Sequence, residues 1–436
     1  MYYQPEIETM DSLHLHTLQD ERLNALVSYV NENIPFYRNA FLEAGIDPNE
    51  FNGLADLTKL PFTVKQDLRD GYPFKMFAVT QDKVARIHAS SGTTGNATVV
   101  GYTESDLSVW GDCFARFLVA AGANKKSVMQ IAYGYGLFTG GLGAHQGGET
   151  LGCTVVPMSS GNTKRQIQFM KDFQTDILCC TPSYALLIAE SALEAGYDPA
   201  KDFNVSSAIL GAEPCSEGMR KEIQDKLGVK MFDIYGLSEV MGPGVACECE
   251  CQQGLHVCED HFIIEIIDPE TLEPVPDGTW GELVITTLSK QCSPLIRYRT
   301  RDISRIISTP CDCGRTFRRI DRIAGRTDDM LIIRGVNVFP SQIEEVITQF
   351  DEITAHYQIV LSNDGPLDRV ELRIETVPDF PFDEVRRIEN LRKKITNELK
   401  SNLQIAVVVK IVEPKSIERS EGKAKRIIDK REGRSL

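Results

Sequence analysis

Residues 207–236 read "SAILGAEPCSEGMRKEIQDKLGVKMFDIYG", two short apolar runs separated by a polar segment long enough for a helix. The runs "SAILGA" (207–212) and "KMFDIYG" (230–236) have the length of buried strands. Two similar runs precede them, "TVVPM" (154–158) and "DILCC" (176–180), and a helix-length segment follows each. Strands that alternate with helices predict a parallel sheet covered by helices. We therefore expect an α/β body.

Helical spacing is also visible before this region. Apolar residues recur along one helix face ahead of Pro35, at Leu23, Leu26, Val27, Val30 and Ile34. Thr103 and Asp106 have the spacing of a capping box, in which each side chain accepts a hydrogen bond from the other residue's backbone. The sequence therefore predicts a helix that ends at Pro35 and another that begins after Thr103.

The pattern changes twice towards the C-terminus. The stretch "HFIIEIIDPETLEPVPDGTWGELVITTL" (261–288) predicts two strands around a Pro/Asp/Gly turn, and so a small antiparallel barrel or sheet. From "GRTDDMLIIRG" (325–335) onward, a helix expected to be capped by Ser341 and Glu344 alternates with apolar runs. We expect an N-terminal domain over residues 1–326 and a small mobile α+β domain over 327–436.

Composition limits the function classes. The net charge of −15 disfavours nucleic acid or an anionic membrane surface as the main partner, although residues 414–436 carry eight Lys/Arg against four Asp/Glu. The sequence has no apolar run long enough to span a bilayer, and its first residues lack the pattern of a secretory signal. Twelve cysteines in such a chain indicate thiols or metal ligands rather than disulfides. These features predict a cytoplasmic protein.

The stretch "SSGTTGNAT" (90–98) has the composition of a phosphate-binding loop, because backbone N–H groups and hydroxyls can point at phosphate oxygens. It lacks the lysine of the G-x-x-x-x-G-K-[ST] loop. An exposed polar turn has the same composition, so other motifs must decide between the two.

Several longer motifs follow in a fixed order: "YGYGLFTGG" (133–141), "GAEP" (211–214), "YGLSE" (235–239), "YRTRD" (298–302), "GRTDDMLIIRG" (325–335) and "RSEGKAKR" (419–426). In this order, and over about residues 20–430, they resemble the adenylate-forming superfamily of acyl-CoA synthetases, peptide-synthetase adenylation domains and luciferases. "YGYGLFTGGLG", "GVNVFPSQIEE" and "SEGKAKR" are similar to the phenylacetate–CoA ligase family. The resemblance implies that an aryl acid reacts with ATP to give an acyl adenylate and pyrophosphate. The thiol of CoA then displaces AMP.

The resemblance also implies roles for single residues. Glu239 would hold Mg²⁺, Asp302 would bind the ribose hydroxyls, and Lys423 (or Lys425, two residues on) would join the substrate carboxylate to the α-phosphate. The full set of implied nucleotide contacts is Ser90, Ser91, Gly92, Thr93, Thr94, Gly95, Gly211, Ala212, Glu213, Pro214, Asp233, Tyr235, Gly236, Ser238, Asp302 and Arg326. Because Asn96-Ala97 replace the family's usual Lys-Pro, phosphate binding should be weaker but retained.

The resemblance further places the acyl pocket and the hinge. Tyr135, Phe138, Ala212 and Ile234 would line an apolar pocket for a flat ring. Asp328 would be the residue about which the C-terminal domain rotates between the two reactions. Family analogy also suggests a homodimer.

Two cysteine clusters indicate a second site. "CECECQQGLHVC" (247–258) and "CDC" (311–313) together hold six cysteines and His256. Four such ligands suit a tetrahedral, structural Zn²⁺, and the resemblance favours Cys249, His256, Cys311 and Cys313. Strand alternation leaves Cys247 and Cys251 open as replacements for Cys249, and a set of thiols without metal is the alternative.

Two other functions stay open. The chain could load an aryl acid onto a carrier-protein thiol, or it could be a degenerate homologue that only binds ligands. Retention of Glu239, Asp302 and Lys423 disfavours degeneracy. The basic tail suits the phosphates of CoA better than an acidic carrier protein.

Overall fold

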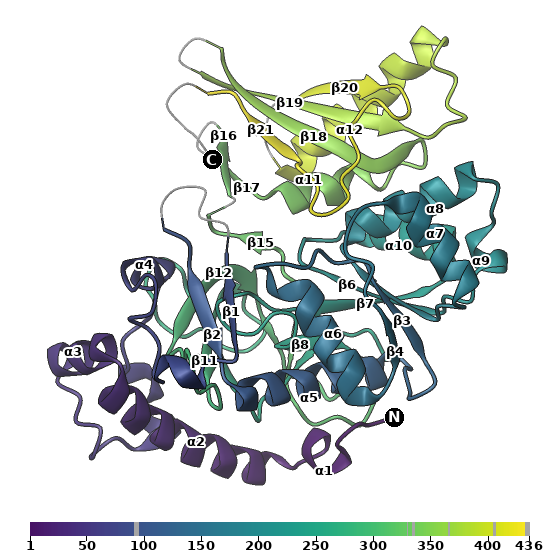
Figure 1. Cartoon of the computed structure of the whole chain (residues 1–436). Coiled ribbons are helices and arrows are strands. Elements are labelled where there is room, and N and C mark those ends of the chain that lie inside the picture. Colours follow the sequence, from purple (N-terminus) through teal and green to yellow (C-terminus); the bar gives the residue numbers. More distant parts are fainter. Residues whose placement is uncertain (91–95, 329, 334–335, 365–366, 404–406, 432–436) are drawn as a thin grey trace.

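The computed structural model describes residues 1–90, 96–328, 330–333, 336–364, 367–403 and 407–431 (Figure 1). Within these residues, the body is built on a nine-stranded sheet with the order β13-β14-β9-β8-β7-β6-β5-β3-β4. Its strands are β3 (Val128–Ile131), β4 (Thr154–Val156), β5 (Ile177–Cys180), β6 (Ser207–Gly211), β7 (Lys230–Tyr235), β8 (Ala246–Glu248), β9 (Leu255–Val257), β13 (Ile306–Ile307) and β14 (Arg319–Ile320). Strands β3 to β7 run parallel, and antiparallel pairing begins between β7 and β8. The expected parallel α/β body is confirmed.

Helices cover both faces of the parallel strands because these strands are apolar on both faces. Leu178 and Leu210 belong to one core cluster, whereas the alternate residues Cys179 and Ile209 belong to another. The helices packed on them are α5 (Glu104–Ala120), α6 (Thr139–Leu151), α7 (Thr163–Asp172), α8 (Pro182–Glu194), α9 (Pro199–Asp202) and α10 (Glu217–Leu227). Figure 1 shows α5 and α6 on one side of the sheet and α7, α8 and α10 on the other. Two-sided burial explains why these strands read as continuous apolar runs.

Two smaller antiparallel sheets complete the body. The strands β10 (Phe262–Ile267) and β11 (Gly281–Thr287) pair around the turn expected from the sequence, and β12 (Tyr298–Ser304) and β15 (Gly325–Arg326) extend that sheet. The strands β1 (Arg86–Ala89) and β2 (Val99–Tyr102) form a hairpin that flanks the glycine-rich loop. That loop therefore joins two antiparallel strands, unlike a P-loop, which joins a strand to a helix.

Helices from the start of the chain pack around this body (Figure 1). They are α1 (Pro5–Glu8), α2 (Ser12–Asn33), α3 (Pro35–Ala44), the 3₁₀ helices η1 (Gly53–Lys59) and η2 (Gln81–Lys83), and α4 (Lys65–Asp70). Figure 1 shows α1 and α2 along the lower side of the body. The helix predicted to end at Pro35 is α2, which ends at Asn33 with Ile34 as its C-cap, and α3 begins at Pro35. The predicted capping box is also present, since Thr103 N–H donates to Asp106 Oδ2 (2.8 Å) and Asp106 N–H donates to Thr103 Oγ1 (3.1 Å).

The C-terminal module has an apolar core of its own. Its elements are β16 (Leu331–Ile333), β17 (Val336–Val338), α11 (Pro340–Ile347), β18 (Ile353–Asp364), β19 (Leu367–Thr376), α12 (Val385–Leu403), β20 (Val408–Val412) and β21 (Ile427–Asp429). Strands β18 to β21 form one mixed sheet in the order β20-β19-β18-β21. Because β15, ending at Arg326, still pairs within the body, the change of sheet falls near the expected position. A domain boundary between residues 326 and 327 stays a prediction.

The prediction that Ser341 and Glu344 cap α11 was wrong. The helix begins at Pro340, and Phe339 N–H donates to Gln342 Oε1 (2.9 Å). Ser341 thus lies inside the first turn, where its hydroxyl donates to the Ala324 carbonyl. Glu344 instead accepts hydrogen bonds from Tyr357 Oη (2.8 Å) and from the Ser216 N–H (3.2 Å). With proline at the first helical position, the helix starts two residues earlier than the Ser/Glu spacing indicated.

In the described part of the chain, every helix is too short or too polar to cross a lipid bilayer.

Candidate active site

The motifs "GAEP" and "YGLSE" begin side by side at one edge of the central sheet. Strands β6 and β7 are parallel neighbours, with Gly211 in register with Ile234. A Cβ at Gly211 would meet the Ile234 carbonyl oxygen at 2.3 Å, so only glycine fits there. The next residue, Ala212, adopts a φ of +72°, a left-handed conformation that is costly for alanine. A tight and strained turn therefore directs the "GAEP" segment out of the sheet.

Glu239, the expected Mg²⁺ ligand, is buried and already has a cationic partner. Its Oε1 lies 3.2 Å from Lys65 Nζ, at the start of α4, and 3.4 Å from Thr98 Oγ1. The Lys290 ammonium supports the backbone on the other side, donating to the carbonyls of Val240 (2.6 Å) and Glu239 (3.4 Å). None of Lys65, Thr98 and Lys290 was predicted from the sequence.

Thr98 connects Glu239 to the glycine-rich loop. Ser90 N–H donates to the Thr98 carbonyl (3.0 Å), and the hydroxyls of these two residues are in contact. The loop residues Ser91, Gly92, Thr93, Thr94 and Gly95 lie outside the described residues. The stem of the loop, at Ser90 and Thr98, is therefore held against the carboxylate expected to bind metal.

Asp302, Tyr235, Arg326 and Asp328 form one hydrogen-bonded chain. Asp302 accepts from Tyr235 Oη (2.5 Å) and from Arg326 (2.9 Å), and Arg326 also binds both oxygens of Asp328 (2.8 and 3.0 Å). Burial raises the pKa of Asp302 to about 6, although the Arg326 charge opposes this effect. The expected ribose ligand and the expected hinge residue are thus linked through one guanidinium group.

Three more expected nucleotide contacts, Asp233, Gly236 and Ser238, lie on or beyond β7. Burial, together with the charge of Glu248, raises the pKa of Asp233 to about 8. Ser238 Oγ is within 3.3 Å of Thr139 Oγ1, at the start of α6. This contact joins the "YGLSE" segment to the loop that carries Phe138. Gly236 lies against the backbone of Gly242 and Pro243, leaving no room for a side chain.

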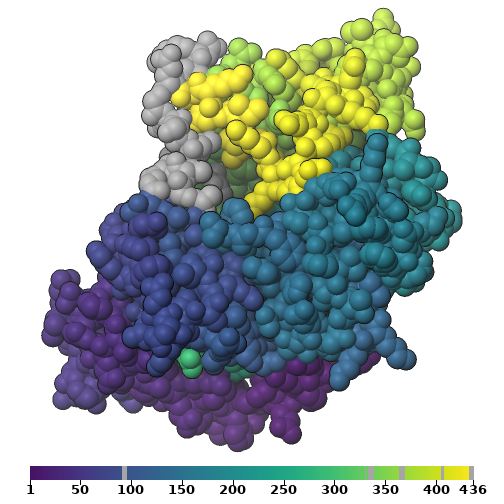
Figure 2. Space-filling view, viewed as in Figure 1, coloured from purple at the N-terminus to yellow at the C-terminus, as the bar shows by residue number. Residues whose placement is uncertain are grey.

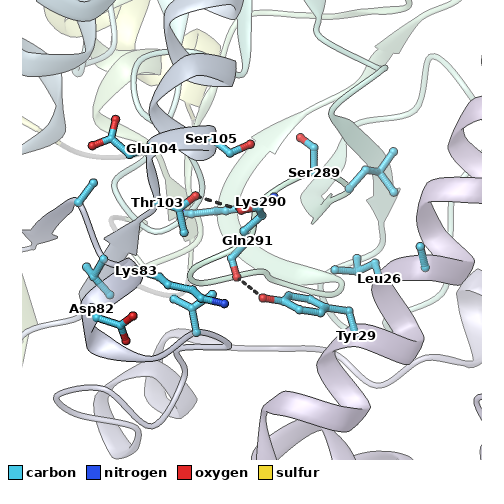
Figure 3. Close-up of a pocket in the computed structure, with 15 residues that line it drawn as sticks. Leu26, Tyr29, Asp82, Lys83, Thr103, Glu104, Ser105, Ser289, Lys290 and Gln291 are labelled. Carbon is cyan, nitrogen blue, oxygen red and sulfur yellow. Dashed lines mark hydrogen bonds between the residues drawn. The ribbon is translucent and has the colours of Figure 1, made fainter.

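The four residues expected in the acyl pocket differ in exposure. Ile234 is buried in the core, and Tyr135 is half-buried with its hydroxyl 3.2 Å from His145 Nδ1. Phe138 is 54% exposed. A cavity of about 1070 Å³ does occur elsewhere, between α2, η2, the start of α5 and residues 288–291 (Figure 3). None of the four expected residues, Ala212 included, lines it.

The segment that carries Lys423 is docked on the body at the "GAEP" motif. Glu213 accepts hydrogen bonds from the backbone of Ser183 (2.6 Å) and of Ala424 (3.0 Å). Thr181, which follows β5, donates to the Gly422 carbonyl (3.0 Å). Two side chains from the ends of neighbouring parallel strands thus hold the backbone on both sides of Lys423. Pro214 follows Glu213 in the same turn.

The cysteine clusters come together in space. One ligand atom from each of Cys249, His256, Cys311 and Cys313 lies within 4.8 Å of the other three. The Cys249 and Cys311 sulfurs are 3.6 Å apart, and Cys313 Sγ is 3.4 Å from His256 Nε2. Hydrogen bonds from Cys249 and His256 lower the pKa of the Cys313 thiol.

The second nitrogen of His256 completes this arrangement. Nδ1 lies 3.0 Å from the Phe317 carbonyl, and donation there leaves the Nε2 lone pair facing the sulfurs. Neither Cys247 nor Cys251 belongs to the group of four. The donor set has the number and chemistry of a tetrahedral metal site.

The chain is similar to proteins of known families. The family model "AMP-binding enzyme" matches residues 48–289, and "AMP-binding enzyme C-terminal domain" matches residues 335–431. The phenylacetate–coenzyme A ligase of Thermus thermophilus is 50% identical, with 99% of this chain and 100% of that protein covered. The enzyme of the same name from Escherichia coli is also 50% identical, with 98% and 97% covered.

A solved relative distinguishes two arrangements of the domains. The structure superposes on 2-hydroxyisobutyryl-CoA ligase in its postadenylation state with a TM-score of 0.92, at 28% identity and over 98% of this chain and 92% of the other. Against the same ligase in its thioesterification state the TM-score is 0.72, at 28% identity and 99% and 93% coverage. The C-terminal module therefore stands against the body as it does in the postadenylation state.

Proposed function

Because this chain belongs to the AMP-binding enzymes, and among them to the phenylacetate–coenzyme A ligases, we propose that it joins an arylacetic acid, phenylacetate first, to coenzyme A with the use of ATP. A carboxylate oxygen attacks the α-phosphorus of ATP, the bond to the pyrophosphate oxygen breaks, and acyl-AMP forms. The sulfur of CoA, having lost its proton, then attacks the acyl carbon, and AMP leaves.

The single observation that carries this proposal is the hydrogen bond between Glu213 and the backbone of Ala424. It holds the residue next to Lys423 on the "GAEP" motif, to which the nucleotide role is assigned. In the first reaction two anions must approach each other, so a cation between them lowers the barrier. Lys423 would supply this cation, while Asp302 would accept hydrogen bonds from the ribose hydroxyls.

Lys65 would supply the charge that the loop lacks. The family's usual Lys-Pro is replaced by Asn96-Ala97, and Lys65 lies 3.2 Å from Glu239 at the stem of that loop. A bound Mg²⁺ would neutralise phosphate charge, and Glu239, an oxygen ligand, suits such a hard cation. Lys65 would then be released from Glu239 to contact phosphate oxygens.

The second reaction requires the C-terminal module to move. The two TM-scores of 0.92 and 0.72 support this, because they reflect two domain arrangements of one relative. Asp328, at the junction, would absorb the rotation, and the ion pair from Arg326 to Asp328 would have to rearrange. The basic C-terminal residues would favour the phosphates of CoA.

A structural Zn²⁺ is a separate proposal. Cys249, His256, Cys311 and Cys313 would hold it, and it would cross-link the 247–258 and 311–313 segments. Its support is the contact between His256 Nδ1 and the Phe317 carbonyl, because donation there leaves Nε2 free to face three sulfurs.

Assembly and location are also proposals. A homodimer in the cytoplasm would agree with the resemblance and with twelve cysteines that are all free thiols. Sedimentation at several protein concentrations would decide the oligomeric state.

The proposed reaction is tested by incubating the purified protein with ATP, Mg²⁺, CoA and a panel of carboxylic acids led by phenylacetate. AMP formed together with loss of the free CoA thiol supports a CoA ligase. AMP without thiol loss, and with transfer to a carrier protein, would support the carrier-loading alternative. ATP binding without AMP from any acid would contradict the ligase activity.

A further inference from the structure

A partly buried carboxylate, Glu190, joins the body to the C-terminal module. Glu190 lies on α8 and is 18% exposed. Its Oε1 accepts from His356 Nε2 on β18 at 2.9 Å, and its Oε2 accepts from Arg419 Nε at 3.1 Å. Lys226, on α10 of the body, lies 3.4 Å from the same carboxylate. In Figure 2 the yellow C-terminal segment lies directly against the teal surface of the body.

Arg419 continues this contact into the module. Its two terminal nitrogens bind the two oxygens of Glu375 on β19, at 2.8 and 2.6 Å. One guanidinium group therefore bridges a carboxylate of the body and a carboxylate of the module. Arg419 is also only four residues before Lys423 on the same segment. The position of Lys423 thus depends on where Arg419 is held.

The charge balance favours an ionised Glu190 in this arrangement. Burial raises the pKa of Glu190, but the hydrogen bond from His356 and the charges of His356, Arg419 and Lys226 outweigh it and bring the pKa to about 2. The charged groups around it also include Glu222, which binds Lys226 (2.7 Å) and the backbone of Ala355 (3.1 Å). A partly buried carboxylate that is paired with Arg419 and Lys226 and hydrogen-bonded to His356 costs much to separate from these partners.

A second ion pair crosses the same interface and provides a comparison. Glu194, one helical turn after Glu190 on α8, pairs with Lys415 of the module. These side chains are 55% and 66% exposed, so water screens their attraction. Exposed pairs of this kind contribute little, whereas the less exposed contacts of Glu190 must be broken when the module moves.

We propose that Glu190 is a positioning residue for the first half-reaction: its bonds to Arg419 and His356 hold the C-terminal module where Lys423 meets the nucleotide. This role rests on the proposed ligase function. Loss of the Glu190 charge shifts the module away from the adenylating arrangement. Formation of the adenylate slows, while thioester formation, which uses another arrangement, does not.

The test compares Glu190→Gln with Glu194→Gln in the full-length protein and measures the two half-reactions separately. The first is pyrophosphate release from ATP, Mg²⁺ and phenylacetate without CoA. The second is thioester formation from preformed phenylacetyl-adenylate and CoA. We expect Glu190→Gln to slow the first by about tenfold and to leave the second unchanged or faster. Glu194→Gln should change both by less than about twofold.

Further variants separate positioning from folding. Arg419→Gln should reproduce the same split, and Glu190→Asp should recover part of the adenylation rate. Equal losses in both half-reactions, or an adenylation rate equal to that of Glu194→Gln, would overturn the role of Glu190. Wild-type protein that releases no pyrophosphate with any acid would reject the ligase function, and with it this role.

Discussion

The ammonium of Lys65 lies 3.2 Å from the carboxylate of Glu239, although 174 positions separate the two residues in the sequence. Lys65 begins a six-residue helix, and Glu239 ends the motif that follows a central strand. Thr98, at the end of the glycine-rich loop, contacts the same carboxylate. The cation that is missing from the loop sequence is therefore present in the fold, supplied by a different element.

Lys65→Met should lower kcat/KM for ATP in the adenylation reaction by roughly 10- to 100-fold, because a preorganised cation near the phosphates is lost. Pyrophosphate release at varied ATP concentration measures this. Lys59→Met is the matched control, since Lys59 is largely exposed and its ion pair among the described residues is with Asp56. If Lys65 merely competes with Mg²⁺ for Glu239, the substitution would instead lower the Mg²⁺ requirement without a loss of rate.

Lys423→Ala should reduce adenylate formation by at least about 100-fold, because charge between two reacting anions is worth several kcal/mol. Thioester formation from preformed adenylate should be spared. Lys425→Ala separates the two candidates, and we expect it to have the smaller effect because the backbone anchors at Gly422 and Ala424 flank Lys423. The reverse order would assign the role to Lys425, and equal losses in both half-reactions would contradict the assignment.

Much of the fold could be predicted because its signals are local. Continuous apolar runs indicated the strands β4 to β7, of which β4 is a partly exposed edge strand, and the Thr103/Asp106 pair indicated the start of α5. The cap of α11 was mispredicted because the helix begins at Pro340, which places Ser341 inside the first turn, where its hydroxyl makes a tertiary hydrogen bond to Ala324. Sequence spacing alone does not carry that information.

The candidate site likewise contains residues that sequence motifs predicted and residues that only the fold reveals. Tyr235, Asp302, Arg326 and Asp328 came from motifs, and the structure links them in one chain. Lys65 and Lys290 have no motif of their own, and only the packing of α4 and of residues 288–291 brings them to Glu239. A lone lysine in a polar segment is usually solvated, so no signal in the sequence marked them.

The activity should fall at acid pH because the Asp302 carboxylate becomes protonated. With a pKa of about 6 in the free protein, the carboxylate gains a proton as the pH falls through 6 and can no longer accept two hydrogen bonds from the ribose hydroxyls. We therefore expect kcat/KM for ATP to decline below about pH 6. Asp302→Asn should abolish this step in the profile, leaving a low, flatter rate.

The contribution of Asp302 to the free energy of unfolding should change with pH in the opposite direction to the activity. The folded-state pKa of Asp302 is raised from 3.8 to about 6, so the folded protein binds the proton more tightly than the unfolded chain does. The contribution of Asp302 to the free energy of unfolding thus increases as the pH falls from about 6 towards 3.8. Stability and activity measured across this window, for wild type and Asp302→Asn, distinguish loss of binding from loss of fold. Parallel declines in both that are unaffected by the substitution would contradict the assignment.

Removal of one sulfur from the four-residue cluster should lower the zinc content and the melting temperature of the protein. It should leave the rates of the two half-reactions nearly unchanged. Cys311→Ser should reduce bound zinc from about one ion per chain to near zero, because structural zinc requires four ligands. The melting temperature should fall by roughly 5 °C or more. Cys153→Ser, at a half-buried thiol outside the cluster, should keep both.

Elemental analysis and thermal unfolding of the two variants measure these effects. The half-reactions of folded Cys311→Ser should stay within about threefold of wild type, because the cluster joins segments of the body and contains none of the residues assigned to ATP or the acid. Zinc that is absent from wild-type protein purified without chelators would reject the metal site. Zinc that is present, with activity lost in proportion to zinc while the protein stays folded, would give the metal a catalytic role that this geometry does not predict.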